Sequence, residues 1–213
     1  MPKKIKKIVP AKSKIRKPMD TPRLSRDDWL DAAFQAVVKG GFDNVRVLVI
    51  ADTLGVTRGS FYWHFTDHAD LIKSLLARWQ AREIAQDLNL QAEATDDPQA
   101  DLERLLEASL AHAGANLENI YFELALRGMG RRDADVALML VDVDKTRMNL
   151  FEEKFLRLTH DPVTASELAV LFYLAIVGGH QALSRPTSSP KAKEFLQGII
   201  KNYLIHQQTP TVR

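Results

Sequence analysis

Apolar residues recur at helical spacing along most of the chain, and polar or glycine-containing breaks divide them into segments. The first segment follows Ser25, which has Asp28 three residues further on, the spacing of a capping box. Its apolar positions continue to Gly40-Gly41, and glycine tolerates the left-handed conformation that ends many helices. This pattern predicts a first helix that Ser25 caps and Gly40-Gly41 terminates.

The next segment is short and is locally ambiguous. Residues 46–50 are apolar enough to fit a strand, but the segment continues at helical spacing to Gly55, and no strand partner is found nearby. We therefore expect a helix over 46–54, a turn at Gly55, and a third helix that Thr57 caps and that runs to about His64.

The remaining two thirds of the chain also carries helical periodicity and no convincing strand. Asp-Pro pairs at 97–98 and 161–162 read as an N-cap followed by proline at the first helical position, and Gly128 and Gly130 are expected to break a helix. The sequence thus predicts an all-α fold of about nine helices. The later helices are expected at 67–90, 98–110, 116–126, 133–158, 162–184 and 190–206.

Charge is distributed unevenly although the net charge is only +2. Residues 1–23 hold nine Lys and Arg and a single acid, Asp20, which makes this segment strongly basic. We interpret residues 1–22 as a disordered basic arm, which either binds nucleic acid or is a solvated tail without a partner. No cysteine is present and no apolar run reaches the ~18 residues of a membrane span, so we expect a cytoplasmic protein that does not bind a membrane.

Residues 46–65 combine the parts of a helix-turn-helix motif. Ala51 is small enough for two helices to cross closely, and Gly55 accepts the turn between them. Four apolar residues are placed to lock the helices together: Ile50, Leu54, Val56 and Phe61. Such a motif presents the start of its second helix to the major groove of DNA.

The short helix after Gly55 is rich in groups that contact DNA. We expect Arg58 either to read guanine or to contact phosphate only, and we expect Phe61 and Phe65 to pack inward. The candidate DNA contacts in this segment are Thr57, Arg58, Gly59, Ser60, Tyr62, Trp63 and His64. Free backbone N–H groups in its first turn also favour phosphate.

The sequence resembles the DNA-binding half of TetR-family transcriptional regulators over about residues 25–75. The resemblance is carried by Arg46-Val47-Leu48-Val49-Ile50-Ala51, Leu54-Gly55-Val56-Thr57-Arg58-Gly59-Ser60-Phe61-Tyr62-Trp63-His64-Phe65, Asp67 and Leu71. It implies an all-helical homodimer in which residues 23–66 bind double-stranded DNA and residues 67–213 bind an effector and dimerise. It further implies a repressor that a small molecule releases from a palindromic operator.

Carried over to this chain, Thr57, Arg58, Ser60 and Trp63 fall at groove contacts, and Tyr62 and His64 at phosphate contacts. The sequence also departs from the family's pattern. His68 stands where a phosphate-binding lysine is common, Leu48 stands where some members carry a base-contacting arginine, and the hydroxyl cap common before the second helix is missing.

The later helices carry candidates for an effector pocket and a dimer interface. Candidate pocket residues are Trp79, His112, Asn116, Phe122, Arg127, Met129 and Met139, with burial in the core as the alternative for each. The dimer candidates on the last two long helices are Phe172, Tyr173, Ile176, Gly179, His180, Leu183, Phe195, Ile199 and Tyr203, with packing inside one subunit as the alternative.

Two other classes of function compete with a ligand-responsive repressor. The chain lacks a phosphate-binding loop, a Gly-x-Ser-x-Gly elbow and a His-Glu-x-x-His motif, so we expect no enzyme, no cofactor and no metal. The second alternative is a DNA-binding factor without a small-molecule ligand, which is architectural, partner-controlled or activating. A dry C-terminal domain would favour that alternative, and an enclosed cavity with a few polar groups would favour a ligand.

Overall fold

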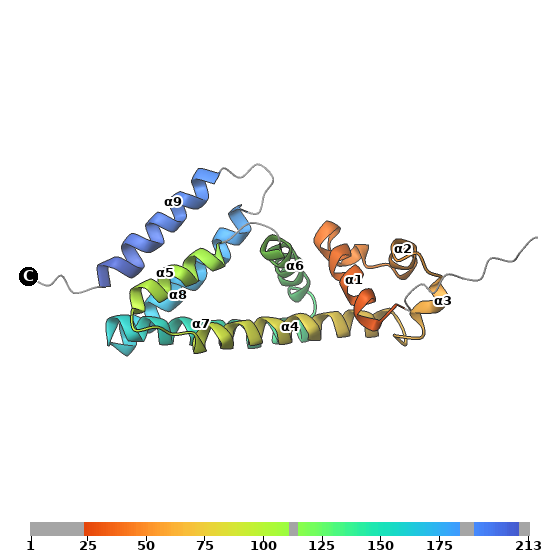
Figure 1. Cartoon of the computed structure of the whole chain (residues 1–213), viewed down its shortest axis with the longest axis horizontal. Helices are drawn as coiled ribbons and strands as arrows, with labels where there is room; N and C mark the ends of the chain where they lie inside the picture. Colours follow the sequence, from red (N-terminus) through yellow and green to blue (C-terminus); the bar gives the residue numbers. More distant parts are fainter. Residues whose placement is uncertain (1–23, 111–114, 184–189, 209–213) are drawn as a thin grey trace, which may run out of the picture.

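The computed structural model describes residues 24–110, 115–183 and 190–208, and within these ranges the regular structure is entirely helical. Nine α-helices are present in the described residues, so the predicted all-α fold is confirmed. Figure 1 shows α1, α2 and α3 gathered at one end of an elongated molecule, with the long helix α4 leading from them to the other helices. The basic segment 1–23 lies outside the described residues.

Helix α1 (Arg26–Gly40) begins and ends as its sequence predicts. The Ser25 hydroxyl accepts a hydrogen bond from the Asp28 backbone N–H at 3.2 Å, and the Asp28 carboxylate accepts one from the Ser25 N–H at 2.7 Å. The C-cap residue Gly41 has φ +78°, a conformation that L side chains rarely adopt. The helix buries Trp29 and other apolar residues of its inner face.

Helices α2 (Val47–Thr53) and α3 (Arg58–Phe61) are shorter than predicted. The chain leaves α3 through a turn, in which the N–H groups of His64 and Phe65 both bond to the Phe61 carbonyl, at 2.9 and 3.0 Å. This turn places Phe65 beside Phe61 in the core. Thr57 is the N-cap residue of α3, but its side chain makes no capping hydrogen bond, so that part of the prediction is wrong.

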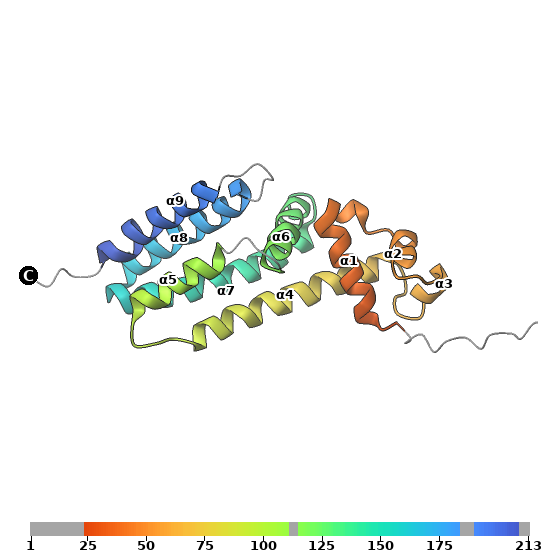
Figure 2. The ribbon, with the colours of Figure 1, turned by 45° about the horizontal axis from the view of Figure 1, so that its top comes forward.

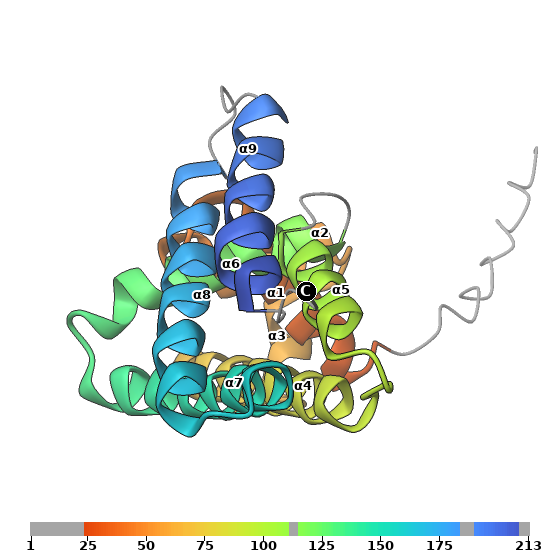
Figure 3. The same cartoon turned by 90° about the vertical axis from the view of Figure 1, so that its left-hand side faces the viewer.

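Helix α4 (His68–Ala92) lies along α7 (Ala134–Thr159), as the rotated view in Figure 2 shows. In the end-on view of Figure 3, α4 and α7 lie at the bottom of the molecule, and α8 and α9 lie above them. The other helices are α5 (Pro98–Ser109), α6 (Ala115–Gly130), α8 (Pro162–Leu183) and α9 (Pro190–Ile200), followed by a π-helical turn (Lys201–Ile205) and a 3-10 turn (His206–Gln208).

Two predicted boundaries are wrong. Helix α6 runs through Gly128 to Gly130, because one glycine costs only about 1 kcal/mol inside a helix that tertiary packing supports. Regular α-helix ends at Ile200 and not near His206, since residues 201–205 widen into the π-helical turn.

Buried apolar side chains form two clusters. The first includes Trp29, Phe61, Trp79 and Phe122, and it joins the three N-terminal helices to α4, α6 and α7. The second fills the space between α5, α7, α8 and the segment from α9 to the π-helical turn. Because Phe122 of α6 belongs to the first cluster, the N-terminal helices share a core with the rest of the molecule.

Helix α8 is unusually apolar. Over Pro162–Ala182 this helix is long and apolar enough, by length and composition alone, to cross a membrane, and 33% of its apolar stretch is buried in the structure. The expectation that no apolar run reaches that length is therefore wrong. One face of α8 packs against α7, its principal neighbour in the fold.

Candidate nucleic-acid interface and internal cavity

The short helix α3 is held from behind by aromatic packing. The rings of Trp29 and Phe61 meet edge to face with centroids 5.4 Å apart, and Phe61 stacks on Phe65 at the same separation. Ala51 is buried, and its carbonyl accepts a hydrogen bond from the Val56 N–H at 2.9 Å, which closes the turn between α2 and α3. The turn needs Gly55, whose φ is +69°.

The other side of α3 and its following turn faces outward. Trp63 is 77% exposed and Tyr62 is 53% exposed, both unusually high for aromatic residues. Thr57, Arg58 and Gly59 are exposed as well, and Ser60 and His64 are half-buried. The structure therefore brings all seven candidate DNA contacts of this segment into one exposed or half-exposed stretch.

Arg58 is oriented by Tyr62, one helical turn away. The guanidinium donates a hydrogen bond to the Tyr62 hydroxyl at 2.9 Å, and the guanidinium carbon lies 5.7 Å from the centre of the ring. The pair presents a positive charge and an aromatic hydroxyl together at the surface. Because Arg58 and Tyr62 are both exposed, the arginine is free to contact either a base or a phosphate group of DNA.

His68, the eighth candidate contact, has a structural partner. Its Nε2 donates a hydrogen bond to the Val45 carbonyl oxygen at 2.6 Å, which ties the start of α4 to the segment before α2. A phosphate contact through Nε2 would have to replace this bond. His68 therefore positions α4 in the structure described here.

Arg26 is a positioning residue that the sequence analysis missed. Its guanidinium lies 4.7 Å above the Phe65 ring and donates hydrogen bonds to Ser74 Oγ and to the His64 carbonyl, at 2.5 and 3.4 Å. It thereby fixes the turn after α3 against α1 and α4. No local pattern marks this role, because its partners lie 38 to 48 residues away.

Most of the predicted effector residues that the structure describes pack in the core or in ion pairs. Trp79 and Phe122 are buried in the first apolar cluster, where Phe122 stacks on Phe34 with centroids 4.9 Å apart, and Met129 and Met139 pack against the same cluster. Arg127 is held by Glu123 and Asp144. The effector site therefore stays a prediction for these residues, and His112 and the Asn116 side chain lie outside the described residues.

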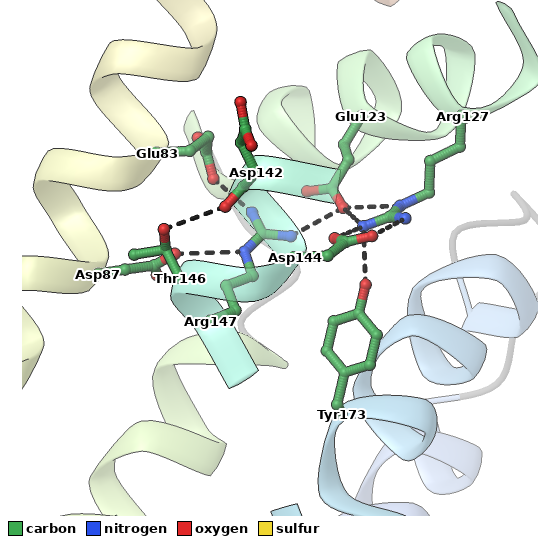
Figure 4. A network of polar contacts seen from close by, with 9 residues as sticks. All are labelled: Glu83, Asp87, Glu123, Arg127, Asp142, Asp144, Thr146, Arg147 and Tyr173. Carbon is green, nitrogen blue, oxygen red and sulfur yellow. Dashed lines mark hydrogen bonds and ion pairs between the residues drawn. The ribbon is translucent and has the colours of Figure 1, made fainter. Parts of the chain in front are cut away.

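A cavity of about 110 Å³ lies instead among α4, α5, α6, α7 and α8. Figure 4 shows the polar network along its wall. The Arg147 guanidinium donates to Glu83 Oε2 at 2.6 Å and to Glu123 Oε1 at 2.9 Å, and its Nε lies 3.6 Å from Asp87 Oδ2. Behind Glu123, Arg127 makes a two-bond fork to Asp144 at 2.6 and 3.0 Å.

The carboxylates of this network differ in their pKa. Burial disfavours the charged form of all three, but the guanidinium groups of Arg147 and Arg127 outweigh it at Glu123 and lower the pKa of Glu123 to about 2. At Asp87 burial dominates and raises the pKa to about 7, and the pKa of Glu83 is also raised by burial. Within the described residues, no group of three or more His, Asp or Glu is placed to hold a metal ion.

Several of the α8 residues predicted for a dimer interface pack inside the subunit, and the interface itself stays a prediction. Phe172, Ile176 and Gly179 are buried inside the subunit, and His180 contacts the Ser109 carbonyl oxygen at 2.7 Å. Tyr173 is half-buried and bonds to Arg127 at 3.1 Å, whereas the Leu183 side chain lies outside the described residues. The exposed apolar residues of the last two α-helices and the π-helical turn are Val163, Val170, Leu171, Leu174, Phe195, Ile199 and Tyr203.

Comparison with known proteins finds relatives of the N-terminal part of the chain. The family model described as bacterial regulatory proteins, tetR family, matches residues 30–75, which include α2, α3 and the start of α4. The chain is 36% identical over 62 residues to the transcriptional regulator TtgR of Pseudomonas putida, covering 29% of this chain and 30% of TtgR. It is also 36% identical over 74 residues to the transcriptional repressor BepR of Brucella suis, covering 35% of this chain and 34% of BepR. The matched stretch thus spans about a third of the length of each of these relatives.

The likeness to solved structures extends further along the chain. A transcriptional regulator from Saccharomonospora viridis, solved in complex with choline, has the same fold with a TM-score of 0.70 and 20% identity, covering 84% of this chain and 96% of that one. The curated relatives are transcriptional regulators and not enzymes, in agreement with the expectation from sequence. Residues 30–75 therefore form a domain that matches the tetR family of bacterial regulatory proteins, and the fold around it is shared with solved transcriptional regulators.

Proposed function

We propose that the chain is a cytoplasmic transcriptional repressor that binds a palindromic operator as a homodimer and releases it when a small-molecule effector binds. One observation carries the DNA-binding part: the exposed Arg58, Tyr62 and Trp63 on a helix whose other side is fixed by buried aromatics. Exposed aromatic and cationic groups on a rigid support can enter a groove without a folding cost. The name of BepR supports repression as the direction of control.

The dimer part of the proposal rests on the apolar surface of α8 and α9. Leu174 is 58% exposed and Phe195 is 72% exposed. Exposed apolar residues on two neighbouring helices favour a contact with another protein, and a two-fold partner would supply the second half-site reader. A partner helix on one side and α7 on the other also account for the apolar composition of α8.

The effector part rests on the cavity and on the path of α4. This helix begins at the α3 end of the molecule (Figure 1). Its residues Glu83 and Asp87 line the cavity. A ligand that alters their contacts with Arg147 acts on the helix that leads to the DNA-binding end. The alternative of a DNA-binding factor without a ligand has less support, because a cavity with convergent polar groups is typical of a ligand site, although this one is partly open to solvent.

The test is a binding titration with a duplex selected from random DNA. We expect Arg58→Ala to cost about 1–3 kcal/mol of specific binding and to relax preference at one base pair in each half-site. The control is Arg131→Ala, since Arg131 is an exposed arginine in the turn between α6 and α7, remote in sequence from α3. Equal affinities of the Arg58→Ala variant and the unmodified protein would remove Arg58 from the interface.

A further inference from the structure

The cavity wall holds more negative than positive charge. Three carboxylates line the cavity, those of Glu83, Asp87 and Glu123, and Arg147 is the guanidinium among them. Arg127 does not correct the excess, because its charge is matched by the Asp144 carboxylate through the two-bond fork. Ions removed from water need a compensating charge, so this excess favours an occupant that is positive.

Two carboxylate oxygens on this wall lack hydrogen-bond donors. Glu83 and Asp87 are each only 8% exposed. Within the described part of the chain Glu83 Oε1 has no hydrogen-bond partner, and Asp87 Oδ2 has no hydrogen bond but forms an ion pair with Arg147 Nε at 3.6 Å. Buried polar atoms are nearly always paired, and leaving one unpaired costs about 1–3 kcal/mol. Both residues belong to α4 and line the same cavity, but the two oxygens are themselves closed to a water-sized group. One occupant with N–H groups can therefore bond to both only if the two carboxyl groups turn towards the cavity.

The rest of the lining is partly apolar and aromatic and partly polar, since Gln86, Ser109, Asn119 and His180 also border the cavity. Leu90, Phe151 and Ile176 border the cavity, and Tyr173 contributes a second ring. Methylene groups gain from contact with such walls, and aromatic faces attract cations. A volume of about 110 Å³ has room for roughly ten water-sized groups, well below the 300–1,000 Å³ of pockets for drug-sized ligands.

We propose that this cavity binds a small aliphatic amine in its ammonium form, with N–H groups donating to Glu83 and Asp87 and the hydrocarbon part against Phe151 and Ile176. The inference rests on the proposed function only in taking this cavity as the effector site. Binding would supply the missing donors and the missing positive charge together. Burial raises the pKa values of Glu83 and Asp87 on the cavity wall, and an ammonium group beside the two carboxyl groups would lower both values.

The test compares 1,4-diaminobutane with 1,4-butanediol by calorimetric titration of the intact, DNA-free protein near neutral pH. The two molecules share their carbon chain and have donors at both ends, but only the diamine is charged. We expect the diamine to bind saturably and at least about tenfold more tightly than the diol. Equal binding of the diol, or no saturable binding of the diamine, would overturn the proposal.

Three further arms sharpen the result. Tetramethylammonium carries charge without N–H donors, so affinity equal to that of the diamine would contradict the role given to the two unpaired oxygens. Glu83→Gln is expected to weaken diamine binding about tenfold or more, and unchanged affinity would place the site elsewhere. Glu107→Gln, which neutralises an exposed carboxylate on α5, is the matched control and is expected to bind as the unmodified protein does.

Operator binding is measured on the same preparations. Loss of the amine response with intact operator binding would refute this inference alone, whereas absence of operator binding with intact amine binding would refute the proposed function alone. The comparison of diamine with diol uses the unmodified chain, so it remains decisive even if Glu83→Gln fails to fold.

Discussion

Phe122 provides the most demanding test of how the two ends of the molecule are joined. It belongs to α6 and is fully buried, with ring centroids 4.9, 5.7 and 6.0 Å from those of Phe34, Phe42 and Trp79. Phe34 lies on α1 and Trp79 on α4, so one side chain packs against both the DNA-binding end and the helix that leads to the cavity.

We expect Phe122→Ala to lower the free energy of unfolding by about 3–5 kcal/mol, since the change removes a buried ring and leaves a cavity between several aromatic groups. This is a large part of the 5–15 kcal/mol typical of native proteins. Phe122→Leu fills part of the space and is expected to cost about 1–2 kcal/mol, which keeps the effect measurable if the alanine variant does not fold.

The assay is urea unfolding followed by far-UV circular dichroism, at one protein concentration because a dimer gains stability by mass action. Trp63→Ala is the control: Trp63 is 77% exposed, so its loss is expected to change stability by less than about 0.5 kcal/mol while weakening DNA binding. A decrease below about 1 kcal/mol for Phe122→Ala would refute the core position and would return Phe122 to the wall of a pocket, as its place in the sequence suggests.

Three further outcomes are expected. Burial raises the pKa of Asp87 to about 7 from its ordinary value of 3.8, so the folded state keeps a proton that the unfolded state has released, and the free energy of unfolding falls as pH rises towards and through 7. Asp87→Asn should abolish about 1–3 kcal/mol of this loss between about pH 5 and pH 8, measured by urea unfolding. An unchanged pH profile would contradict this. Leu174→Glu should convert a particle near twice 24.0 kDa into a monomer in light scattering, whereas Leu138→Glu on α7 should not, and a dimer in both would move the interface. Deleting residues 1–20 should flatten the salt dependence of DNA binding by about 0.9 in log–log slope for each phosphate that the arm neutralises in the intact chain, and equal slopes would make the arm a passive tail.

Local sequence patterns predicted the elements whose causes are local. The capping box of Ser25 and Asp28, the turn at Gly55 and the Asp97-Pro98 start of α5 each depend on residues within a few positions of one another, and each is present in the structure. The exposure of Tyr62 and Trp63 beside buried Phe61 also follows from a short helix that cannot bury every face. The all-α fold class was predictable as well, because helical periodicity is a local property of the sequence.

Which side of α8 is exposed was not predictable, because the helix is apolar on both sides and periodicity does not say which side faces inward. The small residue Gly179 looked like a site for a partner helix. A Cβ at this position would lie 2.8 Å from a Leu196 side-chain carbon and 3.2 Å from one of Leu110, so the glycine serves packing within the subunit. The exposed stripe runs instead through Val170 and Leu174.

The cavity was missed because its charged residues come from three helices. Glu83, Glu123 and Arg147 are separated by 24 to 64 positions along the chain, and no local motif joins them. The predicted pocket residues were instead mainly aromatic and methionine side chains at helical spacing, and most of these are core residues in the structure. Long-range ion pairing of this kind becomes visible only when the helices are packed.

The central claim is that α3 and the turn after it read duplex DNA in a two-fold assembly. Selection of bound duplexes from random DNA by the intact chain tests it most directly. The account predicts enrichment of an inverted repeat, with half-sites spaced by whole turns of the double helix, and loss of that enrichment when Arg58 and Trp63 are both replaced by alanine. No enriched sequence, or the same repeat enriched by the doubly substituted chain, would contradict it.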